Sequence, residues 1–461
     1  MTEKGVFQRP KNNYMAKKIV ILGAGLSGLS ASYHLQSLNN LRGEKKYFDI
    51  YEKENKSGGL CRTERKGEFL FDYSGHQIHL KNEYVKGLIK KLLKDNIKSH
   101  KRNAWVYVIN RYTKYPFQAN LNALPKNMRD ECLSGFYRAS VNNRNKENEE
   151  FTDFEDWILG RFGEGIAKYF MIPFNKKFWK KDLKEITCTW VDKYIPVPQA
   201  EEVKGRFKEG EEKGYGYNIV FQYPKTGGIQ ALPDALAKEI KQIKLNMEAT
   251  RLDLQKKIIE FNNNEKVNYD ILISTLPLKE LLKATINLPE KIKKAGDDLK
   301  FNSVLEINLG LRRKDSSMHW VYVPEKKYPF YRYGYFSNFS ENMAPEGKSS
   351  IFCEISYRGG EKIDQEKMYR DSVKGLIDIG VIKDESEIIE KKILNMEYAY
   401  VIYDKEYKNS TEEIHNFLRS LDVFSIGRYG KWEYSAMEDA IIQGKEIIDL
   451  IGASSVYIPN I

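Results

Sequence analysis

The sequence predicts an α/β fold, and three observations lead to this fold class. A strand, a helix and a second strand follow one another near the start of the chain. A long segment rich in Lys, Asn and Glu then shows helical periodicity, and the second half contains alternating, aromatic-rich segments that are typical of antiparallel strands. With 461 residues, 41% of them hydrophobic, the chain is long enough for two or three domains.

The first three elements are expected to form a βαβ unit. Residues 18–23 are a short apolar run closed by a glycine, which is typical of a buried parallel strand. Residues 26–36 have helical spacing, and residues 48–52 form the second strand. The polar residues 1–14 precede this unit and are expected to be a disordered extension.

The remaining elements are expected in the following order, with a polar loop at 140–150. Further helices are expected at 84–95, 125–138, 152–172, 229–244, 365–379 and 437–451. Further strands are expected at 245–253, 256–262, 269–277, 303–312, 319–323, 330–337, 350–357 and 423–427. The strands between about 300 and 400 predict an antiparallel sheet.

Composition and charge limit the possible ligands and the cellular compartment of the protein. The 75 Lys and Arg residues exceed the 64 Asp and Glu residues, and because this excess is scattered, an anionic small substrate and nucleic-acid binding both stay open. No apolar run approaches the ~18 residues of a membrane span, and the polar N-terminus lacks a signal-peptide core. The cysteines have no paired or metal-type spacing, so we expect reduced thiols, no metal site and a cytoplasmic protein.

A glycine motif at the first turn predicts a dinucleotide site. Gly23 permits the tight turn after the first strand, Gly25 lets the backbone approach a pyrophosphate, and Gly28 lets the helix pack on the sheet. The helix N-terminus can then face the phosphates, and Glu52 at the end of the next strand can bind a ribose. The motif does not separate NAD from FAD, and a glycine-rich turn that serves packing alone is the alternative.

Two further stretches indicate FAD. The first is residues 57–63 (SGGLCRT), where two glycines let the chain wrap around a pyrophosphate and Arg62 supplies a cation. The second is residues 424–430 (FSIGRYG), which precede a helix that begins near Met437. Together with the first motif they resemble the glutathione-reductase-type Rossmann FAD-binding fold of the amine oxidase, protoporphyrinogen oxidase and UDP-galactopyranose mutase group. This resemblance implies noncovalent FAD. The implied cofactor contacts are Gly23, Gly25, Leu26, Ser27, Gly28, Glu52, Lys53, Gly58, Gly59, Leu60, Arg62, Gly75, His76, Gly228, Gly427, Arg428 and Met437.

The same resemblance implies a division of the chain into parts. Residues 1–82, 216–290 and 406–461 would form the three parts of the FAD-binding domain. Residues 83–215 would be a mainly helical insertion that contributes substrate-site residues. Residues 291–405 would form an antiparallel-sheet substrate domain.

Four stretches resemble UDP-galactopyranose mutases, the eukaryotic-type enzymes most closely. They are residues 71–76 (FDYSGH), 114–118 (KYPFQ), 170–179 (FMIPFNKKFW) and 427–434 (GRYGKWEY). The first matches a glycine–histidine loop beside the flavin ring, and the second matches a segment that contacts uridine. The third matches a helical stretch of the substrate site, and the fourth matches the closing motif with its substrate-facing tyrosine. Simple amine oxidases lack the second and third stretches.

The resemblance implies an FAD-dependent isomerase that interconverts the pyranose and furanose forms of a nucleotide sugar, with N5 of reduced FAD as the nucleophile. The implied catalytic residues are His76, Arg312, Tyr400 and Tyr434. The implied substrate contacts are Tyr115, Phe117, Gln118, Asn175, Trp179, Tyr194, Asn218, Arg312, Tyr322, Tyr400 and Tyr434. Structural alternatives stay open, because His76 and Trp179 could serve the core, Arg312 could be a solvated strand end, and the tyrosines could serve packing.

Two positions depart from the mutase pattern. Aligning Trp190 with the family's tryptophan places Tyr194 where the family has a diphosphate-binding arginine, and a tyrosine supplies neither charge nor a bidentate fork. Glu438 and Asp439 begin the last helix, where the family usually has an amide, and an acid beside a diphosphate is unfavourable unless a cation pairs with it. Both departures bear on the identity of the nucleotide sugar and leave the flavin prediction unchanged.

Two other functions stay open on sequence grounds. One is an FAD-dependent oxidoreductase of the amine oxidase or protoporphyrinogen oxidase type, which a lysine near the flavin would favour. The other is a nonenzymatic flavin-binding or partner-binding protein. The expected partners of the mutase are a nucleotide sugar and, as a possible reductant, NAD(P)H, with no nucleic acid.

Overall fold

A computed structural model describes residues 17–42, 48–198, 219–313 and 316–454. It has a mixed α/β fold with parallel and antiparallel sheets, which confirms the predicted fold class at this level. The expected extension at 1–14 and the candidate residue Asn218 lie outside the described residues. No helix in the described ranges is both long and apolar enough to cross a membrane.

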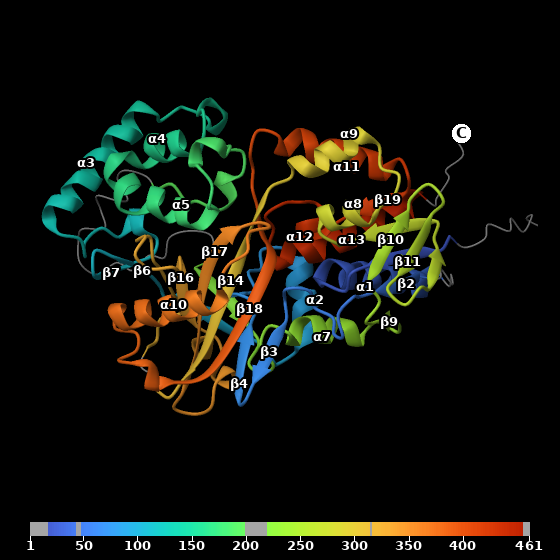
Figure 1. The fold of residues 1–461 in the computed structure, drawn as a ribbon, viewed down its shortest axis with the longest axis horizontal. Helices are drawn as coiled ribbons and strands as arrows, with labels where there is room; N and C mark the ends of the chain where they lie inside the picture. Colours follow the sequence, from blue (N-terminus) through green and yellow to red (C-terminus); the bar gives the residue numbers. More distant parts are fainter. Residues whose placement is uncertain (1–16, 43–47, 199–218, 314–315, 455–461) are drawn as a thin grey trace, which may run out of the picture.

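A five-stranded parallel sheet carries the N-terminal βαβ unit (Figure 1). In spatial order its strands are β19 (Val423–Ser425), β13 (Ile271–Ser274), β1 (Ile19–Leu22), β2 (Phe48–Tyr51) and β9 (Ile243–Lys244). Strand β1 is buried at every position, as its uninterrupted apolar sequence predicts for a central parallel strand. Three segments that are far apart in the sequence therefore build one sheet.

Helices α1 (Leu26–Arg42) and α13 (Met437–Ser454) pack against each other beside this sheet, with α7 (Ala231–Lys238) and α2 (Glu83–Leu93) next to them. The contact between α1 and α13 is close, because a Cβ atom on Gly444 would lie 2.6 Å from the carbonyl oxygen of Ser27. The helix expected at 229–244 is shorter than predicted, because Ile243 pairs with Ile50 at the edge of the sheet.

A small antiparallel sheet and three helices lie beside the parallel sheet (Figure 1). The strands are β10 (Ala249–Asp253), β11 (Ile258–Phe261) and β12 (Lys266–Asn268). The helices are α8 (Leu278–Ala284), α9 (Glu290–Asp298) and α11 (Tyr407–Arg419).

A seven-stranded mixed sheet forms the centre of the molecule (Figure 1). In spatial order its strands are β18 (Ile388–Val401), β14 (Phe301–Leu311), β17 (Ser349–Arg358), β16 (Arg332–Tyr335), β15 (Trp320–Tyr322), β6 (Ala104–Val108) and β7 (Arg111–Lys114). All neighbours are antiparallel except β15 and β6, which run parallel. Helix α10 (Gln365–Ile379) has the bounds that the sequence predicts and packs on β14.

Three strands of this sheet were not expected. Strands β6 and β7 fall in the region predicted to be mainly helical, and they extend the sheet by pairing with β15. Strand β18 carries charged residues at 390–392 and is only partly buried over its first half, so its sequence lacks the apolar alternation of an ordinary strand. Two short pairs complete the strands: β3 (Thr63–Lys66) with β4 (Phe69–Asp72), and β5 (Lys98–Lys101) with β8 (Val220–Tyr223).

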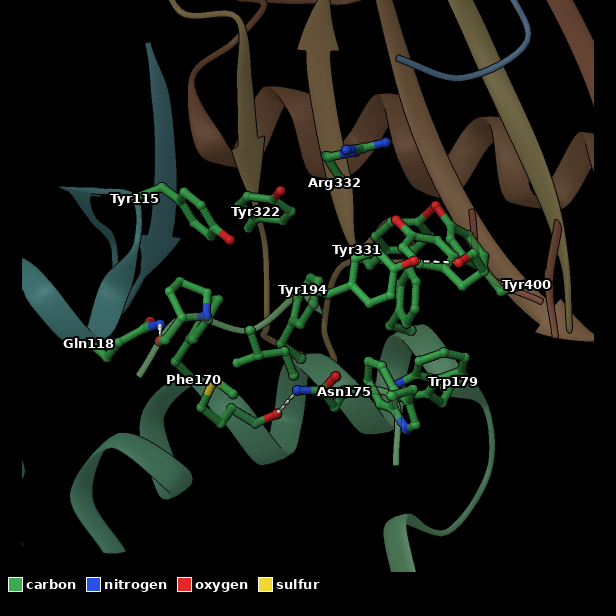
Figure 2. A pocket seen from close by; sticks show the side chains of 17 residues that line it. Tyr115, Gln118, Phe170, Asn175, Trp179, Tyr194, Tyr322, Tyr331, Arg332 and Tyr400 are labelled. Carbon is green, nitrogen blue, oxygen red and sulfur yellow. Dashed lines mark hydrogen bonds between the residues drawn. The ribbon is translucent and has the colours of Figure 1, made fainter. Parts of the chain in front are cut away.

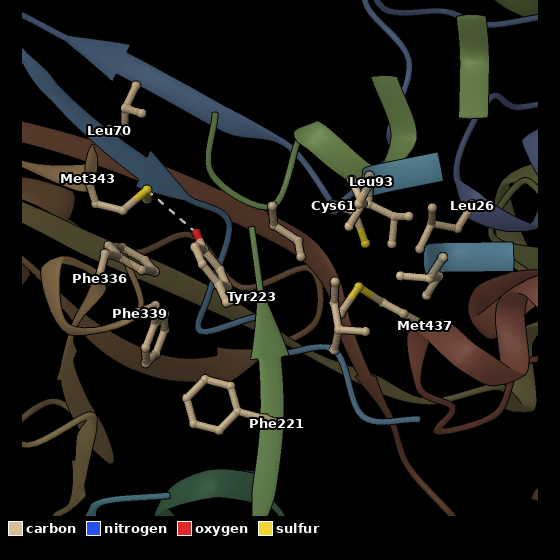
Figure 3. Close-up of a cluster of buried hydrophobic side chains, with 14 of the residues drawn as sticks. Leu26, Cys61, Leu70, Leu93, Phe221, Tyr223, Phe336, Phe339, Met343 and Met437 are labelled. Carbon is tan, nitrogen blue, oxygen red and sulfur yellow. Dashed lines mark hydrogen bonds between the residues drawn. The ribbon is translucent and has the colours of Figure 1, made fainter. Parts of the chain in front are cut away.

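A buried cluster lies where the parallel sheet and the central sheet meet (Figure 3). Leu26, Cys61 and Met437 contribute from the glycine-rich segments, Phe352 contributes from the central sheet, and Phe336 contributes from the turn that follows β16. This shared apolar core fixes the two sheets relative to each other, because separating them would expose the cluster to water.

A helical lobe covers one end of the central sheet (Figure 1). It comprises α3 (Lys126–Asn142), α4 (Phe154–Ile166) and α5 (Ile172–Trp179), with a π-helical turn at Ala167–Met171 between the last two. Helices α3 and α4 approach so closely that a Cβ atom on Gly163, at φ +71°, would lie 2.2 Å from the carbonyl carbon of Gly135. Glycine at this position is therefore required by both backbone conformation and contact.

We expect Gly163→Ala to lower the free energy of unfolding by about 2–4 kcal/mol, because the methyl group meets backbone atoms and the residue is held at positive φ. The matched control is Gly87→Ala on the exposed face of α2, where a Cβ atom meets nothing within 4 Å. This control should raise stability by about 0.5–1 kcal/mol. Urea unfolding measures both, and equal effects of the two substitutions would contradict the close packing of α3 on α4.

Candidate active site

A cavity of about 150 Å³ lies between the helical lobe and the central sheet (Figure 2). Helix α5 forms its floor, and strands β15, β16 and β18 supply the opposite wall. Its lining residues are Tyr115, Gln118, Phe170, Met171, Phe174, Asn175, Phe178, Trp179, Trp190, Tyr194, Ile195, Pro196, Tyr322, Tyr331, Arg332, Tyr400 and Tyr434. Segments from four separate regions of the sequence thus meet at one cavity.

The structure brings together most of the residues expected to contact substrate. Of those that the structure describes, all line this cavity except Phe117 and Arg312. Phe117 is fully buried behind the wall and stacks on Phe170, with ring centroids 5.1 Å apart. Arg312 is exposed at the far end of β14, where its N–H donates to the carbonyl of Glu387, so the structure does not bring it to the cavity.

Arg332 is the charged residue of this lining, and the sequence analysis missed it. It begins β16 and faces Glu354 on β17 in the strand register. Its Nε lies 2.5 Å from Glu354 Oε2, and its Nη2 lies 2.7 Å from Oε1. An arginine inside the aromatic run Phe330 to Tyr335 was the available signal, because a buried cation in a strand needs a partner or a ligand.

The ion pair between Arg332 and Glu354 is largely shielded from solvent: 14% of the Arg332 side chain and 0% of the Glu354 side chain is exposed. Glu354 is fully buried, which alone would raise the pKa of its carboxyl group, but the charge and hydrogen bonds of Arg332 lower that pKa below its usual value. The pKa of Arg332 is raised by the same carboxylate, against the effect of burial. The hydrogen bonds from Arg332 to Glu354 use Nε and Nη2, so Nη1 is not needed for this ion pair.

Tyrosine side chains give the remaining lining both apolar faces and polar tips. Tyr115 and Tyr322 lie together, with ring centroids 4.8 Å apart, and Tyr400 lies over Tyr434 at 5.6 Å. Burial raises the pKa of Tyr115 and of Tyr400, so their hydroxyl groups stay protonated and can donate hydrogen bonds at neutral pH.

Tyr194 holds Tyr434, the cavity-lining tyrosine of the C-terminal segment, in place. Its ring meets the Tyr434 ring edge to face at 4.3 Å, and its hydroxyl donates to the Tyr434 carbonyl. Arg428, predicted as a cofactor contact, lies 4.4 Å from the Tyr434 ring centroid and donates to the carbonyls of Ser435 and Ala399. Tyr194 and Arg428 therefore fix Tyr434 from two sides.

Helix α5 is tied to the sheet that it faces. Lys177 is buried, and its Nζ donates to the carbonyls of Val323 and Glu325, both at 2.9 Å. These bonds attach α5 just beyond the end of β15, while Asn175 and Trp179 on the same helix line the cavity. Burial lowers the pKa of Lys177 to about 7.

The histidine loop, residues 73–76, lies against the central sheet on the side of Glu354. The Ser74 hydroxyl donates to Glu354, and its N–H donates to Glu306 on β14. Ser74 has φ +71°, so this bent conformation is held by the two carboxyl groups. Burial, with the nearby charge of Arg428, lowers the pKa of His76 to about 4, which keeps its ring neutral at physiological pH.

The glycine-rich segments form a cradle above the parallel sheet. A Cβ atom on Gly59 would lie 3.2 Å from the Cα atom of Gly25, and one on Gly28 would lie 2.0 Å from the Gly23 carbonyl oxygen. Glu52 accepts the N–H of Ala24 at 2.7 Å, which fixes the carboxylate at the first turn. The three predicted stretches therefore lie together at the start of α1.

Residues of the C-terminal stretch complete this cradle. Gly427 has φ +82°, and a Cβ atom there would lie 2.6 Å from the Ser27 hydroxyl oxygen. Met437, Leu26 and Gly228 are buried nearby, and Lys53 is exposed. A Cβ atom on Gly228 would lie 2.3 Å from the hydroxyl oxygen of Thr63.

The family model for flavin-containing amine oxidoreductases matches residues 26–378, which is most of the chain. The chain belongs to this family.

Known relatives of this flavin-containing family agree with the resemblance found in the sequence. A crystal structure of reduced UDP-galactopyranose mutase superposes with a TM-score of 0.89, 29% identity and coverage of 95% of both chains, which confirms the predicted resemblance to that enzyme group. The chain is 23% identical over 279 residues to an L-amino-acid oxidase from Crotalus adamanteus and 22% identical over 337 residues to mitochondrial protoporphyrinogen oxidase from Nicotiana tabacum. It spans about half of the length of the L-amino-acid oxidase, 46%.

Membership of this family implies a flavin, and the cradle fits one. Several buried polar atoms of the surrounding segments have no hydrogen-bond partner within the described residues: Arg62 Nε, His76 Nδ1, Gln230 Oε1 and Ser435 Oγ. Unpaired buried polar groups are costly, so a polar ligand that contacts them would be stabilised. Gly25 and Gly59 carry no side chains that would shield the backbone N–H groups at the start of α1 from a pyrophosphate.

The carboxylates of the two acids at the start of α13 accept hydrogen bonds from backbone N–H groups. Glu438 accepts the N–H groups of Lys81 and Asn82, both at 2.7 Å, and Asp439 accepts the N–H of Ala436 at 2.8 Å. Both carboxylates therefore sit at a helix N-terminus, where a negative charge is favourable.

His319 fixes the strand that carries Tyr322. It directly precedes β15, and its Nδ1 accepts the N–H of Asn103 at 2.9 Å beside the parallel pair Trp320 and Ala104. Only 6% of His319 is exposed. Burial, aided by His100, lowers its pKa to about 4, so the folded protein keeps this ring neutral.

This pKa shift predicts acid sensitivity with a definite sign. The pKa of His319 is lower in the folded than in the unfolded protein, so its contribution is complete above pH 6.5 and is lost as the pH falls from 6.5 towards 4. The stability advantage of wild type over His319→Asn should shrink by about 1–2 kcal/mol between pH 7.5 and pH 5. Urea unfolding at the two pH values measures it, and a constant advantage would contradict a neutral, buried His319.

Proposed function

We propose that the protein is an FAD-dependent nucleotide-sugar mutase that interconverts pyranose and furanose forms of the sugar, as UDP-galactopyranose mutases do. The observation that carries this proposal is Arg332, a buried cation set among tyrosines in the cavity beside the histidine loop. A nucleoside diphosphate sugar offers aromatic, polar and anionic groups to such a lining. The 29% identical mutase structure supports the same conclusion.

The proposed cofactor is noncovalent FAD, held by the glycine cradle as a Rossmann-type domain holds a dinucleotide. When bound and reduced, FAD supplies a nucleophile for the anomeric carbon through its N5 atom. The domain division proposed from the sequence goes with this assignment: the parts at 1–82, 216–290 and 406–461 bind FAD, and the parts at 83–215 and 291–405 bind substrate.

The chain's own residues would bind and orient the substrate. Arg332 would contact the diphosphate, and the hydroxyl groups of Tyr400 and Tyr434 would donate hydrogen bonds to it. Tyr115 and Gln118 lie at the end of the cavity that the sequence assigns to the base. Tyr194 supplies no second charge, so neutralisation of the diphosphate falls mainly on Arg332.

One observation favours the mutase over an amine-oxidase-type oxidoreductase. A lysine near the flavin was the feature expected to favour the oxidoreductase, and none of the described cavity-lining residues is a lysine. Lys177 lies on α5, which forms the floor of the cavity, and its Nζ donates to the carbonyls of Val323 and Glu325.

We expect the dithionite-reduced protein, and not the oxidised protein, to interconvert UDP-galactopyranose and UDP-galactofuranose. Arg332→Ala should lower kcat/KM by about 100-fold or more, because it removes a charged diphosphate contact. Arg312→Ala is the matched control and should leave kcat/KM unchanged, since Arg312 lies outside the cavity. Chromatography of the nucleotide sugars measures turnover. Oxidation of an amine without any furanose product would contradict the proposal.

A further inference from the structure

Three charged residues form a row across neighbouring strands of the central sheet. Glu306 on β14 faces Glu354 on β17, and Glu354 faces Arg332 on β16. Directly opposed residues in a sheet point to the same face, so the three side chains lie side by side. Glu306 and Glu354 are fully buried, and Arg332 reaches the cavity at the end of the row.

The two carboxyl groups of this row differ in charge. Glu354 is the ionised partner of Arg332. Burial, together with the negative charge of Glu354, raises the pKa of Glu306 well above its usual value, which favours its protonated form. The row therefore contains an ion pair beside a carboxyl group that favours the uncharged form.

The row is joined to the histidine loop through Ser74. The Ser74 hydroxyl donates to Oε1 of Glu354, the oxygen that also accepts Arg332 Nη2 at 2.7 Å. Arg332 Nη2 lies 3.4 Å from the Ser74 hydroxyl oxygen. One carboxylate oxygen is thus shared between the residue that faces the cavity and the loop that carries Gly75 and His76.

We propose that Glu354 is a positioning residue that transmits the occupancy of Arg332 by an anion to the histidine loop and hence to the flavin. This inference rests on the proposed function, which places a diphosphate at Arg332 and the flavin beside the loop. An anion in the cavity that attracts Arg332 weakens the hydrogen bond from Arg332 to Oε1 of Glu354. Ser74, which shares that oxygen and is held at positive φ, then shifts with the loop.

Glu306 provides the matched comparison for this role. Glu306 holds the loop through the N–H of Ser74 and has no hydrogen bond to Arg332. Glu306→Gln keeps the acceptor oxygen and the zero charge. Glu354→Gln removes the charge and one of the two acceptor oxygens that bind Arg332, of which Oε1 also accepts the Ser74 hydroxyl. Ser74→Ala cuts the link from the loop side and leaves the ion pair intact.

The test is a titration of the FAD-loaded oxidised proteins with UDP, read in two ways. Tryptophan fluorescence reports UDP binding, since Trp179 and Trp190 line the cavity, and the visible difference spectrum reports the surroundings of the flavin. Glu354→Gln and Ser74→Ala should bind UDP within about tenfold of wild type. Their flavin difference spectrum at saturating UDP should be smaller by about fivefold or more, while Glu306→Gln should match wild type.

Three results would overturn the inference: a wild type that binds UDP without any flavin response, a full response in both Glu354→Gln and Ser74→Ala, or an equal loss in Glu306→Gln. The two substitutions test the link from opposite sides, so failure of one variant to fold leaves the other to decide.

A second measurement separates this inference from the proposed function. If UDP does not bind to wild type, the nucleotide-sugar proposal fails. The midpoint potential of the bound flavin then tests whether Glu354 influences the flavin. Glu354→Gln should raise that potential, because it removes a buried negative charge beside the loop, and Glu306→Gln should not. Equal potentials in wild type and Glu354→Gln would overturn the inference.

Discussion

The buried ion pair between Arg332 and Glu354 is the interaction on which the candidate site depends. Removing one partner of such a pair leaves an uncompensated buried charge and costs about 3–5 kcal/mol. The pair aligns β16 with β17, presents a cation to the cavity and provides the acceptor that holds Ser74. The register of β16 and β17, the charge of the cavity and the position of the histidine loop therefore depend on the same two side chains.

The scaffold around this pair is shared with enzymes of different chemistry, so the fold alone does not give the function. The family includes oxidases of amino acids, and the parallel sheet with its glycine cradle suits any flavin enzyme of this group. The candidate substrate site is the cavity between α5 and the central sheet, where six tyrosines and one arginine belong to the lining. Lys177 and His319 keep those elements in place from positions outside the cavity lining.

The sequence predicted the parts of the molecule that have strong local signals. The βαβ unit, the glycine motif and α10 were predicted because apolar periodicity and glycine spacing are properties of short segments. Motifs such as residues 114–118 and 170–179 also led to cavity residues, including Tyr115 and Asn175. The resemblance led to Arg312 and missed Arg332, which lies within the predicted strand 330–337, because only the pairing of β16 with β17 shows that Arg332 has a buried partner.

The affinity for UDP compared with uridine tests most directly whether the Arg332 cation binds a diphosphate. Isothermal titration of wild type and Arg332→Ala with both ligands isolates the contribution of the phosphates from that of the base. Wild type should prefer UDP by about 100-fold or more, and Arg332→Ala should lose most of that preference while still binding uridine. Equal affinities of wild type for UDP and uridine, or an unchanged preference in Arg332→Ala, would contradict this role of the cavity arginine.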